Sequence, residues 1–248
     1  MINTSIPWKR TGGVDVLSNK INKDMWSSVN PDNKVPFPAE LDDLIRLHYL
    51  ITSRKVTKIL EFGVGKSTIV FDHALSQNKN AFGNYVETYL RRSNPFECHS
   101  VENSKEWIET IKRSHKTKNV FFHYSSCQIG TFNDRICTFY ETLPNICPDF
   151  IYLDAPDQFS VSGDIRGIST RDPDRLPMSA DILALEHFLL PGTLIVVDGR
   201  TANARFLKTN FQRDWTYKYF NDYDQHFFEL NEDPLGPYNA KQIEFSTT

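Results

Sequence analysis

The chain has 248 residues, with 28 Lys or Arg and 31 Asp or Glu, so its formal net charge is −3. Hydrophobic residues make up 40% and charged residues 24%, a balance that excludes a disordered chain, a collagen and a coiled coil. This length predicts one α/β domain with additions. A net charge so near zero provides no overall field for nucleic acid or an anionic membrane, so we expect neither as a partner.

The cysteines and the apolar stretches indicate the compartment. The four cysteines stand singly, at 98, 127, 137 and 147, which argues against a zinc site of the usual spacing and against a secreted disulfide scaffold. The first residues lack the apolar segment of a signal peptide. The longest apolar stretch, 188–197, is interrupted by Pro191 and Gly192 and is far shorter than the roughly 20 residues that span a bilayer. We expect a soluble cytoplasmic protein.

In chain order, residues 1–38 are rich in Asn, Ser, Gly and Pro and predict an irregular arm, followed by a single domain over 39–248. Apolar residues at mostly three- and four-residue spacing predict an amphipathic helix over 39–54. Strands and helices then alternate. The predicted strands are 58–62, 98–101, 119–124, 150–153 and 193–197, the predicted helices are 67–75, 105–114, 133–143, 179–189 and 202–211, and the closing antiparallel pair is 217–220 with 226–230. The polar and aromatic segment 77–95 is interpreted as an insertion.

This alternation predicts the fold class. Strands that are continuously apolar and separated by helices indicate a mostly parallel sheet covered on both faces, which is a doubly wound α/β domain. Ligands of such sheets bind at the carboxyl ends of the strands, where the strand order reverses. The residues at those ends are polar or glycine: Glu61 to Ser67, Glu102, Ser125 to Cys127, Asp154 and Asp198.

The turn after the first strand carries the most informative motif. Gly63 and Gly65 allow the backbone to turn tightly and to approach a ligand, and the helix that starts near Ser67 offers unpaired amides to an anionic group. Glu102, at the end of the second strand, can accept both hydroxyls of a ribose. These features together predict a site for a nucleotide-like cofactor.

In these motifs the sequence resembles the class I S-adenosylmethionine-dependent methyltransferases. The matching segments are 60–65 (Leu-Glu-Phe-Gly-Val-Gly), Glu102, 150–154 (Phe-Ile-Tyr-Leu-Asp) and 191–198, and the resemblance extends over about 58–198. It implies a seven-stranded Rossmann-like sheet with a reversed last strand. Two features depart from the family pattern: Ser67 replaces the third glycine, and Glu61 lies 102 − 61 = 41 residues before Glu102, about twice the usual interval.

The resemblance also implies roles for residues at the strand ends. Glu61, Gly63 and Gly65, with Ser67 at the start of the helix, would surround the methionine part of S-adenosylmethionine. Glu102 would hold the ribose, and Ser126 and Cys127 would flank the adenine. Asp154 would face the methionine amine or the substrate.

The catalytic candidates are the carboxylates Asp154, Asp198 and Asp157. A methyltransferase must align the acceptor and, for a hydroxyl, remove its proton. Some related enzymes use a divalent metal, which Asp154 and Asp198 could hold. However, Gly199 follows Asp198 where the catechol-type metal site has Asn, so carboxylates bonded to the backbone or the cofactor are favoured over metal ligands.

The acceptor side is predicted from the 23-residue loop 155–177, which is long enough for a functional lid. Arg166 and Arg171 in this loop, with Arg200 after the fifth strand, could bind a phosphate or carboxylate on the acceptor. A solvated loop with internal ion pairs is the equal alternative. A homo-oligomer is possible.

Three other functions stay open beside a methyltransferase that acts on a small-molecule hydroxyl, by family resemblance that of a sugar or natural product. Residues 65–68 (Gly-Lys-Ser-Thr) look like the end of a Walker A motif, but Leu60 stands where its first glycine belongs. A nicotinamide dehydrogenase would need a third glycine at Thr68. The third alternative is a cofactor-binding module without catalysis.

Overall fold

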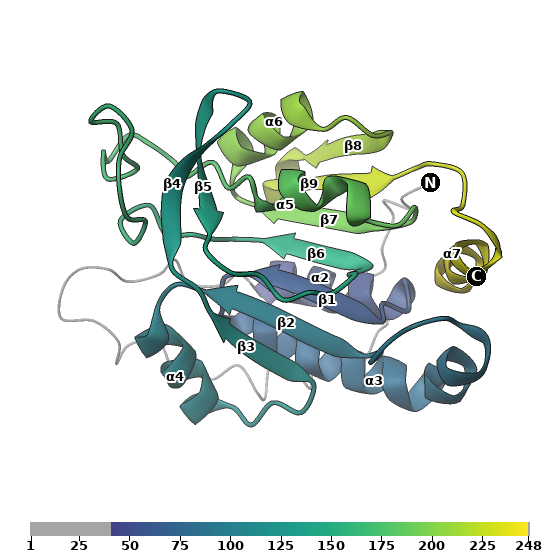
Figure 1. Ribbon diagram of the computed structural model, residues 1–248. Helices are drawn as coiled ribbons and strands as arrows, with labels where there is room; N and C mark the ends of the chain where they lie inside the picture. Colours follow the sequence, from purple (N-terminus) through teal and green to yellow (C-terminus); the bar gives the residue numbers. More distant parts are fainter. Residues whose placement is uncertain (1–40, 248) are drawn as a thin grey trace.

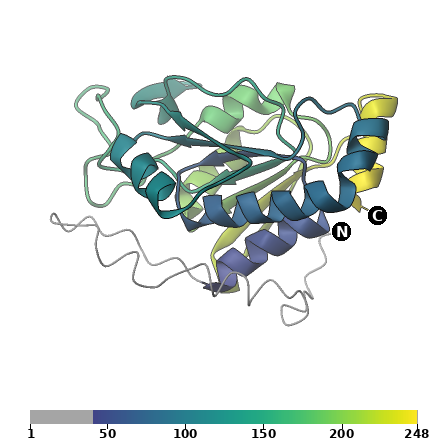
Figure 2. The ribbon, with the colours of Figure 1, turned by 90° about the horizontal axis from the view of Figure 1, so that it is seen from below.

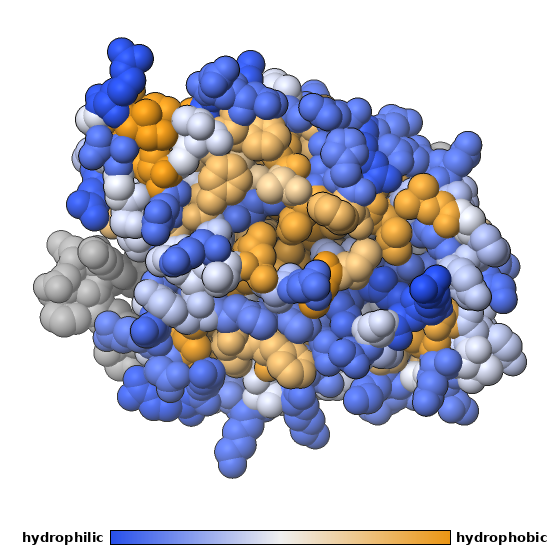
Figure 3. All heavy atoms as spheres, viewed as in Figure 1, coloured by the Kyte–Doolittle hydropathy of each residue, from blue (hydrophilic) through white to orange (hydrophobic). Residues whose placement is uncertain are grey.

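A computed structural model describes residues 41–247, which form a seven-stranded sheet with helices on both faces (Figure 1). The arm predicted for 1–38 lies outside the described residues. Within 41–247, none of the helices combines the length and the apolar character that crossing a membrane would require. Apolar residues form a band across the middle of the face seen in Figure 3, bordered by hydrophilic residues.

The strand order confirms the predicted doubly wound, Rossmann-like sheet. β1 lies in the interior, pairs in parallel with β2 on one side and with β6 on the other, and is therefore the place where the strand order reverses. The last strand, β9, is antiparallel to both of its neighbours, β7 and β8. In spatial order the strands are β3 (Val120–Tyr124), β2 (Glu97–Glu102), β1 (Lys58–Phe62), β6 (Phe150–Leu153), β7 (Leu194–Asp198), β9 (Gln225–Leu230) and β8 (Trp215–Phe220).

The helices cover the two faces because each presents an apolar side to the apolar strands (Figure 2). On one face, α2 and α3 pack on β1, β6 and β7 through residues such as Leu47, Phe71 and Phe150. On the other face, α5 and α6 pack through Ile182 and Leu207. The helices are α2 (Leu41–Ser53), α3 (Lys66–Tyr89), α4 (Lys105–Ser114), α5 (Asp181–Leu185), α6 (Thr201–Asn210) and α7 (Pro237–Thr247), with short 3₁₀ turns at Glu186–Phe188 and Asn221–Tyr223.

Two helical segments of the structure differ from the sequence predictions. The segment interpreted as an insertion, 77–95, is largely helical, because α3 runs without interruption for 24 residues to Tyr89. The long interval between Glu61 and Glu102 is therefore occupied by a long crossover helix. The helix α7 follows β9 and was not predicted.

The helix predicted for 133–143 is wrong, because this segment belongs to a β-hairpin. β4 (Cys127–Phe132) and β5 (Arg135–Tyr140) pair antiparallel and form a separate two-stranded sheet. Asn133 and Asp134 join them with φ angles of 48° and 61°. Positive φ at both central residues is the geometry of the tightest hairpin turns, and Asn and Asp tolerate it better than most residues.

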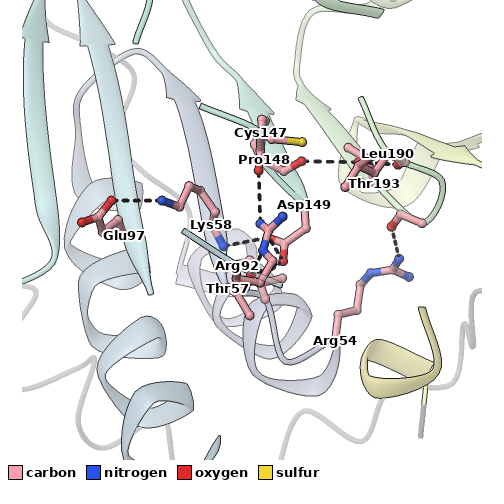
Figure 4. Close-up of polar contacts among 12 residues, drawn as sticks. Arg54, Thr57, Lys58, Arg92, Glu97, Cys147, Pro148, Asp149, Leu190 and Thr193 are labelled. Carbon is pink, nitrogen blue, oxygen red and sulfur yellow. Dashed lines mark hydrogen bonds and ion pairs between the residues drawn. The ribbon is translucent and has the colours of Figure 1, made fainter. Parts of the chain in front are cut away.

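A polar network fixes the amino ends of the strands (Figure 4). Asp149, which precedes β6, accepts hydrogen bonds from the Thr57 hydroxyl at 2.6 Å and from the Lys58 amide at 2.8 Å. Arg92 lies 3.5 Å from the same carboxylate. The Lys58 ammonium pairs with Glu97 of β2 at 3.1 Å. Loops and strands distant in sequence are thus held together by charge pairs at this edge.

Candidate functional site

The turn between β1 and α3 is three residues long, Gly63 to Gly65. Gly63 has a φ of +99°, and a Cβ there would lie 3.1 Å from Ala155 Cβ, so the turn requires glycine at this position. A Cβ on Gly65 would meet only Ser67 Oγ, at 3.9 Å. The side of the turn at Gly65 is therefore open to a ligand, whereas the side at Gly63 is packed.

Glu61 lies beneath this turn and is fully buried. Ser67 and Thr68, in the first turn of α3, donate hydrogen bonds to its two oxygens at 2.6 and 2.8 Å. Ser100 of β2 donates a third, at 2.5 Å. Burial raises the pKa of Glu61 to about 7, although these hydrogen bonds act in the opposite sense. Glu61 therefore supports the turn from below, and its carboxylate faces protein hydroxyls where a contact with the cofactor was predicted.

Glu102 connects the end of β2 to the same turn. Its Oε2 accepts a hydrogen bond from the amide of Val64, between the two glycines, at 3.1 Å, and its Oε1 accepts one from the Ser104 amide at 2.9 Å. Burial raises the pKa of this carboxyl group. Each carboxylate oxygen can accept more than one hydrogen bond, so both oxygens can still bind a ribose hydroxyl.

Asp154, at the end of β6, is held by Arg200. The Arg200 guanidinium donates to the backbone carbonyls of Asp154 at 2.8 Å and Pro156 at 3.0 Å, and its Nε lies 3.5 Å from Asp154 Oδ1. The Asp154 side chain is 55% exposed, yet the crowded strand ends desolvate it and raise its pKa, while Arg200 lowers it. Arg200, predicted to bind the acceptor, is thus engaged in positioning Asp154.

Asp198, at the end of β7, is oriented by two donors. Tyr152 Oη donates to Oδ2 at 2.5 Å, and Gln225 Nε2 donates to Oδ1 at 3.0 Å. Burial, and next the charge of Asp154, raise the pKa of Asp198 to about 6. Asp154 and Asp198 are therefore close enough to interact, as the prediction for the strand ends required.

The orientation of Gln225 is itself fixed from α2. Arg46 Nη1 donates to Gln225 Oε1 at 3.0 Å and to Asp43 Oδ1 at 2.5 Å, and its guanidinium lies 3.6 Å from the centre of the Tyr223 ring. Because arginine only donates, the amide oxygen of Gln225 must face Arg46 and its NH₂ must face Asp198. Sequence reasoning missed Arg46, Tyr152 and Gln225, since only the pairing of β9 with β7 brings Gln225 beside Asp198.

The remaining predicted residues lie around this centre. Asp157 accepts the Phe159 amide at 2.8 Å, and its charge acts on Glu102. Ser126 donates to Glu141 at 2.5 Å. Cys127 is buried in the core at the base of the hairpin, and burial raises its pKa to about 12. Its side chain is therefore a core group, and any contact with adenine would involve its backbone.

The loop 155–177 is anchored on the hairpin, where the Ser162 amide donates to the Cys127 carbonyl at 3.0 Å. Asn103 donates to Ser160 Oγ at 2.9 Å, which ties the loop to the residue after Glu102. Arg166 and Arg171 are exposed on it, and within the described part of the chain no ion pair joins either to a carboxylate. The alternative of a loop stabilised by ion pairs of these two residues is not supported.

Asp154 and Asp198, the two carboxylates that could hold a divalent metal, both have partners within the protein. In residues 41–247 no group of three or more His, Cys, Asp or Glu side chains is arranged to hold one. Asp198 accepts Tyr152 and Gln225, and Asp154 is paired with Arg200. Because Mg²⁺ is often held by only one or two carboxylates together with water, metal binding by Asp154 and Asp198 stays a prediction.

The geometry also speaks against a Walker A motif. Only Gly63 to Gly65 separate β1 from α3, too few residues to surround a phosphate with successive amides. The hydroxyls of Ser67 and Thr68, one of which would bind Mg²⁺ in that motif, donate to Glu61 instead.

No family model and no curated protein matches the sequence. Solved structures that match include the O-methyltransferase TomG from Streptomyces achromogenes in complex with SAM, at 15% identity over 92% of this chain and 100% of that one, with a TM-score of 0.43. An O-methyltransferase from Bacillus cereus in complex with SAH matches at 15% identity over 90% of this chain and 98% of that one, with a TM-score of 0.45. A Podospora anserina methyltransferase bound to SAH matches at 12% identity over 93% of this chain and 100% of that one, with a TM-score of 0.47.

Proposed function

We propose that this chain transfers a methyl group from S-adenosylmethionine to a hydroxyl of a small molecule, by resemblance a sugar or natural-product intermediate. The observation that carries the proposal is the hydrogen bond between the Glu102 carboxylate and the Val64 amide. It joins an acid suited to a ribose to a glycine turn that is open at Gly65, at the point where the strand order reverses. Doubly wound sheets bind nucleotide-like cofactors there.

The residues divide the chemistry between two neighbouring strand ends. The cofactor supplies an electrophilic methyl group on its sulfonium, and the protein must align the acceptor and take its proton. Asp198 is the proposed proton acceptor, because its pKa of about 6 leaves it ionised at neutral pH and more basic than an ordinary carboxylate. Tyr152 and Gln225 hold its orientation. Asp154, which is exposed and steadied by Arg200, is proposed to bind the amine of the methionine part.

The proposal for the acceptor site rests on the sequence alone. Arg166 and Arg171, exposed on the loop 155–177, are proposed to bind an anionic group of the acceptor. Arg200 is not needed for this role, since its side chain is engaged with Asp154 and Pro156. No step is assigned to a metal ion.

Calorimetric titration with S-adenosylhomocysteine, and separately with ATP and magnesium, tests the proposal. We expect micromolar binding of S-adenosylhomocysteine only, weakened at least about tenfold, or about 1.4 kcal/mol, in Glu102→Ala. The matched control, Glu109→Gln on the exposed side of α4, should bind like the wild type. Binding of ATP alone would reject the proposal in favour of a nucleotide hydrolase. Tight cofactor binding without methyl transfer to any acceptor in a broad screen would favour a non-catalytic module.

A further inference from the structure

Tyr140, the last residue of β5, carries a buried hydroxyl that has no hydrogen-bond partner within residues 41–247. The residue is only 5% exposed. A buried polar group without a partner costs about 1–3 kcal/mol, and the large majority of such groups in native proteins are satisfied. The hydroxyl of Tyr140 therefore requires an explanation that the described chain does not supply.

The surroundings of Tyr140 place it under the proposed cofactor site. Its ring stacks on Phe62, the last residue of β1 and the one before Gly63, with ring centres 5.8 Å apart. Its backbone pairs with Cys127, and its amide donates to Asp181 at 3.1 Å, which holds the residue in place. The charged groups that act on its hydroxyl include Glu102 and Arg200. The side chain thus extends from the hairpin toward the ends of β1 and β2.

From this placement we infer that the Tyr140 hydroxyl binds the nucleoside part of the cofactor. The inference rests on the proposed function. Glu102 is the residue proposed for the ribose, and Cys127, the strand partner of Tyr140, is the one predicted beside the adenine, whereas Asp154 is proposed for the methionine side. A phenol can donate to, or accept from, a ribose oxygen or a purine nitrogen. Because the hydroxyl is enclosed in the ligand-free protein, contact with a ligand requires neighbouring side chains to move on binding.

The test uses Tyr140→Phe, which removes only the hydroxyl. S-adenosylhomocysteine and adenosine should each bind about 5–10-fold more weakly than to the wild type, the range of one net hydrogen bond. The melting temperature of the ligand-free variant should be unchanged or higher, because a buried group without a partner has been removed. The control is Tyr217→Phe on β8, whose hydroxyl is already paired with His226 at 2.9 Å. It should leave both affinities unchanged.

The other outcomes are distinct. Wild-type affinity of Tyr140→Phe for both ligands overturns the inference and leaves the proposed function standing. A loss for S-adenosylhomocysteine without a loss for adenosine overturns the assignment to the nucleoside. A lower melting temperature of the ligand-free variant also overturns it, since the hydroxyl would then have a partner in the empty protein. If the wild type binds neither ligand, the proposed function fails and the inference fails with it.

Discussion

The two edges of the central sheet use carboxylates in opposite ways. At the amino edge, Asp149 is paired with Arg92, and Glu97 with Lys58. At the carboxyl edge, Glu61 and Glu102 accept hydrogen bonds only from hydroxyls and backbone amides. The amino edge therefore pairs these carboxylates with cations, while Glu61 and Glu102 at the carboxyl edge accept hydrogen bonds from neutral groups.

This difference separates stability from binding. A carboxylate that is paired with a cation and accepts hydrogen bonds from several backbone amides holds loops together and is not available to bind a ligand. At the carboxyl edge, burial is the main cause that raises the pKa values of Asp198 and Glu102, and the charges of Asp154 and Asp157 respectively raise them further. Such an edge attracts a positively charged ligand, and the sulfonium and amine of the proposed cofactor are of that kind.

The largest effect is expected at the amino edge. Asp149→Ala removes the acceptor for the Thr57 and Lys58 amides and the partner of Arg92, so the free energy of unfolding should fall by about 3 kcal/mol. Urea denaturation measures this loss in the free energy of unfolding. Asp149→Asn keeps an acceptor and should lose less. A loss below about 1 kcal/mol for the alanine variant would mean that the two edges do not differ in this way.

At the carboxyl edge, the pH dependence of stability should reveal Glu61. Its pKa is about 7 in the folded protein, against an ordinary value of 4.5. The folded state therefore binds the proton more tightly, and stability is lost as pH rises through this interval. Relative to Glu61→Gln, the unfolding free energy of the wild type should fall by about 2 kcal/mol between about pH 5 and pH 8.

Urea denaturation of both proteins across this range gives the difference. Burial lowers the pKa of His48 to about 4, so its titration makes the unfolding free energy rise with pH between about 4 and its ordinary value. This contribution is present in both proteins and cancels in the difference. A difference that stays constant with pH would show that Glu61 is ionised at its ordinary pKa.

The smallest effect on stability is expected from alanine substitutions at the two glycines of the turn, Gly63 and Gly65. Gly63→Ala must place a side chain at a φ of +99° and 3.1 Å from Ala155 Cβ, so about 1–2 kcal/mol of stability should be lost. Gly65→Ala meets only Ser67 Oγ at 3.9 Å and should change stability by less than about 0.5 kcal/mol, while weakening S-adenosylhomocysteine binding by occupying its approach. Thermal denaturation measures the stability of each variant, and calorimetry measures its affinity for S-adenosylhomocysteine. Unchanged affinity of Gly65→Ala would place the ligand elsewhere.

The sequence predicted the sheet well because its strands are short, apolar and regularly spaced. The helix predicted for 133–143 was wrong at a segment where Ile136, Phe139 and Tyr140 are spaced as on one face of a helix, although they belong to a strand. The signal for a hairpin was present, since Asn133 and Asp134 separate two runs that contain β-branched and aromatic residues. The length of α3 was hidden because much of its second half is exposed, and an exposed helix has little apolar periodicity to detect.

The strand-end acids of the candidate site were also predictable from sequence, but their partners were not. Glu102, Asp154 and Asp198 follow apolar runs, and parallel strands bring such ends to one edge. That Arg200 holds Asp154, or that Gln225 holds Asp198, depends on how α6 and β9 pack against the sheet. Sequence patterns that indicate which face is buried do not specify which polar groups meet there.

The position of β1 has a consequence for how the chain reaches this fold. β1 lies between β2 and β6, and Phe150–Leu153 of β6 follow it only after two helices, two strands and a hairpin. During synthesis, one edge of β1 therefore has no partner until more than half of the chain has been made. An unpaired edge next to apolar side chains invites pairing with another chain. The strand that leads into the turn Gly63 to Gly65 is thus also exposed to misassembly before the domain is complete.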